Sequence, residues 1–107
     1  MDNADRWLMV ATQAARAAAI YLAEHWEKPQ EALARPEHDV KLAADRESER
    51  LILEKLRDTP FPVVSEETRA ESPPRDGSPW WAVDPLDGTV NYERGFPFCA
   101  ISVALLE

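Results

Sequence analysis

A proline stands between two aspartates in the tract Trp80–Thr89, which reads Trp-Trp-Ala-Val-Asp-Pro-Leu-Asp-Gly-Thr. The first part of the tract, Trp80–Val83, is a short apolar run that is typical of a buried strand. Because Pro85 has no N–H to donate to a sheet, we expect this strand to end near Asp84. Pro85 also fixes its own φ and favours an extended Asp84, so the sequence predicts a stiff turn after the strand.

The carboxylates of Asp84 and Asp87 can both face one point in such a turn. Two anions held so close repel each other unless a cation or a proton lies between them. Magnesium suits this place because it prefers oxygen ligands, and the main-chain carbonyl of Leu86 is a further oxygen. A solvated turn is the alternative, since Asp-Gly is a common turn pair. A calcium loop of the EF-hand type is excluded, because Leu86 occupies its third position and Gly88 its fifth.

The residues after the second aspartate favour a ligand site over a plain turn. Gly88 allows the backbone to approach a ligand closely, and Thr89–Tyr92 can begin a helical turn whose free N–H groups would face an anion. A second apolar run, Cys99–Leu105, predicts a strand that returns like the second arm of a hairpin. The tract is therefore consistent with a site for a metal ion and a phosphate.

The longer tract Val83–Tyr92 resembles the signature of the inositol monophosphatase family. Further pieces match the same family in the right order along the chain: Asp39–Asp45, Phe61–Glu67, Phe96–Phe98 and Ile101–Leu105. The resemblance implies an α/β fold, an α+β layered sandwich of the sugar-phosphatase type. The chain would be the N-terminal portion of it, with two helices packed on a partial, mainly antiparallel sheet.

On this interpretation residues 1–107 form the N-terminal part of an inositol monophosphatase-like domain whose C-terminal half is absent. In the family that half carries a Trp-Asp motif, whose aspartate completes the second metal site, and most of the substrate contacts. The chain departs from the family at Leu42, where a threonine is usual, and at Ser65, where a glycine is usual. These departures concern the substrate and the response to lithium.

The resemblance implies magnesium as the cofactor and names its ligands. Glu66, Asp84 and the carbonyl of Leu86 would hold a first ion, and Asp84 and Asp87 would contribute to a second. A phosphate monoester repels an incoming nucleophile, so cations that neutralise its oxygens and stabilise the leaving alkoxide lower the barrier.

The resemblance also implies three catalytic residues and a phosphate-binding segment. Glu66 and Thr89 would position the attacking water, with Asp45 oriented toward Thr89. The backbone N–H groups of Gly88 and Thr89 would bind the phosphate.

The implied function is a magnesium-dependent phosphomonoesterase that hydrolyses a small phosphorylated metabolite. Inositol monophosphate is the expected substrate, because Thr89–Tyr92 matches the inositol-type branch. Two alternatives remain, a 3'(2'),5'-bisphosphate nucleotidase and a non-catalytic, truncated fragment. The expected partners are a small phosphate ester and either a second copy in a homodimer or the missing C-terminal half.

Composition limits the other function classes. A formal net charge of -8 argues against a nucleic-acid partner. Gln13 and Arg16 interrupt the most apolar helical segment and no basic leader precedes it, so we expect neither a membrane span nor a signal peptide. Cys99 is the only cysteine, which rules out an internal disulfide; we expect a buried structural thiol and a cytoplasmic protein.

Helical spacing predicts two helices, Asp5–Trp26, ended by Pro29, and Ala44–Arg57. The expected core stripe of the first helix is Leu8, Ala11, Ala15, Ala18, Leu22 and Trp26. The expected apolar face of the second is Ile52, Leu53 and Leu56.

A short strand is predicted at Phe61–Ser65, and connecting loops at Lys28–His38 and Thr68–Pro79. The two histidines, His25 and His38, lack partners at metal-ligand spacing, so surface roles are expected for both. A solvated surface role is also expected for Lys41, with a phosphate contact as the alternative.

Overall fold

The computed structural model describes residues 3–26, 32–34, 41–67, 72–96 and 99–107. In chain order the elements are α1 (Asn3–Glu24), β1 (Ala32–Ala34), β2 (Lys41–Leu42), α2 (Ala43–Leu56), β3 (Val63–Ser65), β4 (Trp80–Asp87), α3 (Thr89–Glu93) and β5 (Ala100–Leu106). Both predicted long helices and all three predicted strands are present, with ends that differ by one or two residues. Only β4 differs more, as described below.

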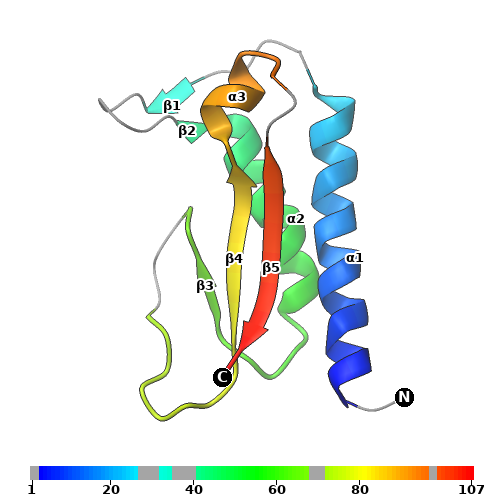
Figure 1. Cartoon of the computed structure of the whole chain (residues 1–107), viewed down its shortest axis with the longest axis vertical. Helices are drawn as coiled ribbons and strands as arrows, with labels where there is room; N and C mark the ends of the chain where they lie inside the picture. The colour runs from blue at the N-terminus through cyan, green and yellow to red at the C-terminus, as the bar shows by residue number, and fades with distance from the viewer. Residues whose placement is uncertain (1–2, 27–31, 35–40, 68–71, 97–98) are drawn as a thin grey trace.

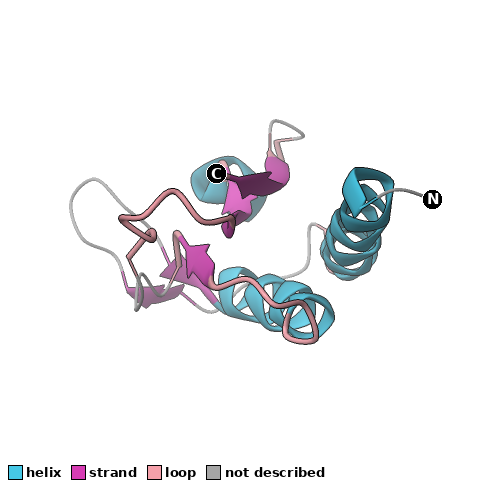
Figure 2. Cartoon of the chain, turned by 90° about the horizontal axis from the view of Figure 1, so that it is seen from below, coloured by secondary structure: helices cyan, strands magenta, loops and turns pink. Residues whose placement is uncertain are grey.

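Two layers form the molecule. The sheet has the order β3-β4-β5, with β3 parallel and β5 antiparallel to the central strand β4. Helices α1 and α2 lie next to each other on one side of this sheet, α1 over β5 and α2 over β4 (Figures 1 and 2). The predicted α/β layering of two helices on a partial sheet is therefore confirmed, and the sheet is mixed, with one parallel and one antiparallel pair.

Strand β4 continues through Pro85 to Asp87, so the expectation that it ends near Asp84 is wrong. In its pairing with β5, Asp84 lies opposite Ser102 and Asp87 opposite Ala100. Two residues of β4 thus face the single residue between Ser102 and Ala100, which defines a β-bulge. A bulge leaves one residue outside the hydrogen-bond ladder, and a proline is tolerated in a central strand at such a point.

The main core lies between the helices and the middle of the sheet. Its buried members are Ala14, Ala18, Ile52, Leu56, Trp81 and Val83. Trp81 is the largest fully buried side chain, and its indole N–H donates to Thr59 Oγ1 at 2.8 Å. A second cluster at the end of the sheet near α3 contains Leu22, Ala44, Leu86 and Tyr92.

The predicted core stripe of α1 is correct at Ala18 and Leu22, which are buried, and wrong at its N-terminal end, where the helix is rotated so that Trp7 replaces Leu8. Leu8 is 67% exposed, and Ala14, which the predicted stripe omits, is fully buried. Trp7 takes the inward place and packs edge-to-face on Phe61, with 4.9 Å between ring centroids. A large aromatic ring buries more apolar area than a leucine, so the rotation that covers Trp7 is favoured.

Parts of the predicted loops differ or lie outside the described residues. Ala32–Ala34, within the predicted loop 28–38, forms strand β1 and pairs antiparallel with β2. In the second predicted loop, residues 72–79 have no helix or strand. Pro29, His38, residues 68–71 and the side chains of Lys41 and Leu42 lie outside the description. Within the described residues, no helix is long and apolar enough to cross a membrane.

We expect Ile52→Ala to lower the free energy of unfolding by about 2 to 5 kcal/mol, because the truncation leaves a cavity in the main core. Leu8→Ala is the matched control and should change this free energy by less than about 0.5 kcal/mol, since Leu8 is exposed. Urea titration followed by tryptophan fluorescence measures both. An equally large loss in Leu8→Ala would show that Leu8 belongs to the core after all.

Tyr92 should make stability depend on alkaline pH. Its hydroxyl donates to the Leu22 carbonyl at 2.8 Å, in the last turn of α1, and burial raises its pKa to about 12. The folded chain therefore holds this proton more tightly than the unfolded chain, in which a tyrosine has a pKa of about 10. The resulting stabilisation is complete below pH 10 and is lost as the pH rises through about 12.

We accordingly expect Tyr92→Phe to be less stable than the parent at pH 8 and to lose less stability between pH 10 and about 12. Urea unfolding across this range gives both quantities. Tyr21→Phe is the control. Burial also raises the pKa of Tyr21, but this side chain is less buried than that of Tyr92, so its loss should change the pH dependence less. Parallel pH profiles for the parent and Tyr92→Phe would contradict the assignment.

Candidate active site

One face of α2 carries three buried polar side chains in its first two turns. Asp45, Ser48 and Glu49 are exposed by 7% or less, and their spacing of three and four residues places them on the same side of the helix. Ile52 and Leu56 continue this face into the main core. The inward face of α2 is thus polar at its N-terminal end and apolar at its C-terminal end.

Each of the three polar residues contacts a different segment of the predicted site. Thr89 Oγ1 donates to Asp45 Oδ1 at 3.0 Å. Ser48 Oγ donates to the Pro85 carbonyl at 2.6 Å. Ser65 Oγ donates to Glu49 Oε2 at 2.6 Å. Helix α2 is therefore the element to which the three segments are attached.

The Asp84–Asp87 segment is held by short-range bonds as well. The N–H of Leu86 donates to Asp84 Oδ1 at 3.3 Å, and the Leu86 carbonyl accepts from Thr89 Oγ1 at 3.2 Å. Asp84 is half-buried and Asp87 exposed. The Leu86 carbonyl, a predicted metal ligand, thus lies next to the predicted water-positioning hydroxyl.

Gly88 makes the sharp change of direction from β4 to α3. Its φ of 88° and ψ of 39° are left-handed, a conformation that costs glycine little. Its carbonyl accepts the N–H of Tyr92 at 3.0 Å, so the predicted helical turn at Thr89–Tyr92 is present as α3. This turn brings the Thr89 hydroxyl to Asp45.

Glu66 lies beside Asp84 through the parallel pairing of β3 with β4. Ser65 is in register with Val83, and the N–H of Glu66 donates to the Val83 carbonyl at 2.9 Å. The next residues along the two strands are Glu66 and Asp84, so their backbones are neighbours. The Glu66 side chain is exposed.

The predicted ligands fit magnesium in their chemistry, because carboxylates and a main-chain carbonyl are hard oxygen donors. The backbones of Glu66 and Asp84 are also neighbours, since β3 runs parallel to β4 and ends opposite Val83. However, in the described part of the chain no three His, Cys, Asp or Glu side chains form a group that could hold a metal ion. The chain therefore offers donors for part of a metal cage.

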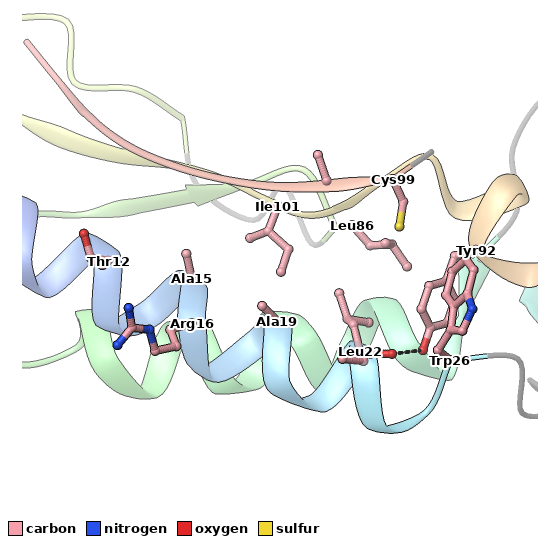
Figure 3. A pocket seen from close by; sticks show the side chains of 12 residues that line it. Thr12, Ala15, Arg16, Ala19, Leu22, Trp26, Leu86, Tyr92, Cys99 and Ile101 are labelled. Atoms are coloured by element: carbon pink, nitrogen blue, oxygen red, sulfur yellow. Dashed lines mark hydrogen bonds between the residues drawn. The ribbon is translucent and has the colours of Figure 1, made fainter. Parts of the chain in front are cut away.

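A separate pocket of about 850 Å³ lies between α1, α3 and the start of β5 (Figure 3). Side chains of α1 and of the sheet end face each other across it, and its lining includes Ala15, Ala19, Leu22, Leu86, Tyr92 and Ile101. Among the described residues, none of those that line it is Asp or Glu. This pocket is apolar and is distinct from the acidic end of β4.

Cys99 lies at this pocket just before β5 and is exposed, so the expectation of a buried thiol is wrong. Partial burial still raises the pKa of the Cys99 thiol. A raised pKa lowers the thiolate fraction, which disfavours a nucleophilic role.

Ser48 and Glu49 are not among the predicted site residues, because only Ile52, Leu53 and Leu56 were expected on the inward face of this helix. A signal for them existed. Both lie on the same helical face as the predicted core residue Ile52, three and four positions before it. Polar residues on a core-facing stripe are expected to bond buried groups, and these do.

Known proteins share this architecture. A model of the inositol monophosphatase family matches residues 3–107. The inositol-1-monophosphatase of Synechocystis is 34% identical over 102 residues, which are 94% of this chain and 36% of that protein. The fructose-1,6-bisphosphatase/inositol-1-monophosphatase of Aquifex aeolicus is 39% identical over 113 aligned positions, which cover all of this chain and 41% of that protein.

A solved structure gives the same result for the fold. The crystal structure of the extragenic suppressor protein suhB from Bartonella henselae superposes with a TM-score of 0.83 at 31% identity, over 95% of this chain and 41% of that one. The chain thus spans about two-fifths of the length of these proteins. With the family model matched along nearly all of its length, the chain belongs to the inositol monophosphatase family.

Proposed function

We propose that this chain carries the water-positioning residues and part of the magnesium site of a phosphomonoesterase. Its substrate would be a small phosphorylated metabolite, with inositol monophosphate first. One observation carries the proposal. The hydroxyl of Thr89, which closely follows the Asp84–Asp87 segment in the chain, donates a hydrogen bond to the buried Asp45. A cytoplasmic location is part of the same proposal.

The Thr89 hydroxyl is suited to orienting a water molecule. It has one proton and two acceptors within reach, Asp45 Oδ1 and the Leu86 carbonyl. Once that proton is donated, the lone pairs of Oγ1 can accept an O–H of the attacking water. Glu66 would act as general base and take the proton of the other O–H of this water, so Thr89 orients the nucleophile and is not the nucleophile itself.

Glu66, Asp84 and the Leu86 carbonyl would hold one magnesium ion, and Asp84 and Asp87 would contribute to another. When bound, magnesium supplies positive charge that offsets the charge on the phosphate and on the leaving oxygen. The backbone N–H groups of Gly88 and Thr89 would bind the phosphate, and the left-handed Gly88 lets the chain approach it closely.

Two other functions are kept. A 3'(2'),5'-bisphosphate nucleotidase would use the same residues on a larger substrate. A non-catalytic role is favoured by one observation, the lack of a three-carboxylate group among the described residues. Pairing with a C-terminal half, or with a second copy, would supply the ligands that these residues do not provide. The net charge of -8 disfavours nucleic acid as a direct partner.

We expect the isolated 107-residue chain to bind magnesium weakly and to release little phosphate from inositol monophosphate. Missing ligands of the second ion should raise the barrier by several kcal/mol, which lowers turnover roughly a thousandfold, since a factor of ten is about 1.4 kcal/mol. Calorimetry and a phosphate-release assay measure the two quantities. Robust magnesium-dependent turnover by the purified chain, abolished in Asp84→Asn, would show that these residues suffice alone.

The second test uses a chimera in which this chain replaces the matching N-terminal part of the Aquifex aeolicus relative. Asp87→Asn should weaken magnesium binding and strongly reduce turnover, because it keeps the shape of the side chain but removes its charge. Thr89→Val should reduce turnover while affecting magnesium affinity less, because it loses a hydrogen bond worth about 0.5 to 1.5 kcal/mol and more at a reacting centre.

Inositol monophosphate and adenosine bisphosphate are offered to the chimera in parallel, with the unmodified Aquifex aeolicus protein as control. A shift of preference toward the bisphosphate, relative to the unmodified Aquifex aeolicus protein, would favour the nucleotidase. If both variants keep the parental rate at saturating magnesium, the Asp84–Thr89 segment is a structural turn and the phosphatase proposal fails.

A further inference from the structure

Glu49 is a buried acid for which the proposed reaction has no use. It is 7% exposed, and its Oε2 accepts the Ser65 hydroxyl at 2.6 Å, a contact buried between α2 and the end of β3. A carboxyl group is costly to bury, and its removal from this place would leave the Ser65 hydroxyl without that acceptor. We expect this hydrogen bond to fix the position of Ser65 and of the residues that follow it in the chain.

Ser65 is the residue directly before Glu66, and its hydroxyl makes two contacts. While it donates to Glu49, its oxygen accepts the N–H of Glu67 at 3.3 Å. The donation to Glu49 orients the lone pairs of Oγ, so the two bonds depend on each other. Glu66 lies between Ser65, which carries this hydroxyl, and Glu67, whose N–H donates to it. The N–H of Glu66 itself donates to the Val83 carbonyl.

The preceding residue of α2 fixes the other candidate ligands. Ser48 donates to the carbonyl of Pro85, which stands between the backbone positions of Asp84 and Leu86. Ser48 and Glu49 are consecutive on a rigid helix, so one turn of α2 sets the place of both acidic segments. The separation of Glu66 from Asp84 is therefore determined by α2 as well as by the sheet.

We propose that Glu49 is a positioning residue, which acts through Ser65 to set the direction in which the chain leaves β3 and so places the Glu66 carboxylate beside Asp84. This inference rests on the proposed function for the role of Glu66 as a metal ligand. It adds a residue that touches neither metal nor substrate and that depends on a serine at a position where the family usually has glycine.

The test follows Mn²⁺ binding to the 107-residue chain by NMR. In the parent, Mn²⁺ should broaden the amide signals of Glu66 and Glu67 together with those of Asp84 and Asp87. Glu49→Ala should bind Mn²⁺ roughly tenfold more weakly than the parent, so that the same broadening requires a higher Mn²⁺ concentration, as expected when a partner that orients a ligand is removed. Its matched control is Glu54→Ala, an exposed acid of the same helix, which should behave like the parent.

A double-mutant cycle separates positioning from general loosening. If Glu49 acts through Glu66, Glu49→Ala should weaken Mn²⁺ binding in the parent but add no further loss in a Glu66→Gln background. Equal losses in both backgrounds would overturn the proposal. Ser65→Ala should reproduce Glu49→Ala, whereas Ser65→Thr, which keeps the hydroxyl, should retain the parental Mn²⁺ affinity.

Hydrogen exchange without metal distinguishes the remaining outcomes. The Glu67 amide should exchange faster in Glu49→Ala and in Ser65→Ala than in the parent and in Glu54→Ala. Unchanged exchange would overturn the proposal and leave the proposed function standing. Absence of site-specific Mn²⁺ broadening in the parent would overturn both. Should Glu49→Ala fail to fold by circular dichroism, Ser65→Ala and Ser65→Thr, which leave the buried acid in place, decide the question.

Discussion

The hydrogen bond from Ser48 to the Pro85 carbonyl joins helix α2 to the bulge of β4, and the arrangement of the candidate site depends on it. A bulge takes a residue out of the ladder, so the buried Pro85 needs a partner for its carbonyl from outside the sheet. A buried acceptor left without one costs about 1 to 3 kcal/mol. Ser48 removes this cost, and because it belongs to a rigid helix it also fixes where the two aspartates that flank the proline lie.

The same helix face serves two purposes along its length. Ile52 and Leu56 pack under Trp81 in the main core, whereas Asp45, Ser48 and Glu49, one to two turns earlier, bond the backbone or hydroxyl groups at the ends of the strands. Strands β3 and β4 are parallel, and Glu66, the first residue after β3, lies beside Asp84 of β4, so these two acids are brought together. The packing of the apolar turns thus aligns the polar turns with the site.

Local sequence was sufficient to predict the two long helices, the three strands of the main sheet and the glycine turn into α3, because each depends on spacing or on one residue type. The features that could not be predicted depend on tertiary contacts. The bulge at Pro85 requires knowledge of the partner strand, and the rotation of α1 follows from the contact between Trp7 and Phe61. The exposure of Cys99 depends on where β5 begins, and the roles of Ser48 and Glu49 on which segments lie opposite α2.

Burial divides the acids of the site into two groups with different chemistry. Asp45 and Glu49 are almost fully buried and each accepts a hydrogen bond from a hydroxyl group, so a hydrated cation has little access to either of them. Glu66 and Asp87 are exposed and Asp84 is half-buried, so a hydrated cation can approach them. A magnesium ion keeps several of its waters, which favours ligands at the surface over ligands in the interior. The inner acids therefore orient hydroxyl groups, and the outer acids are those that a cation can reach.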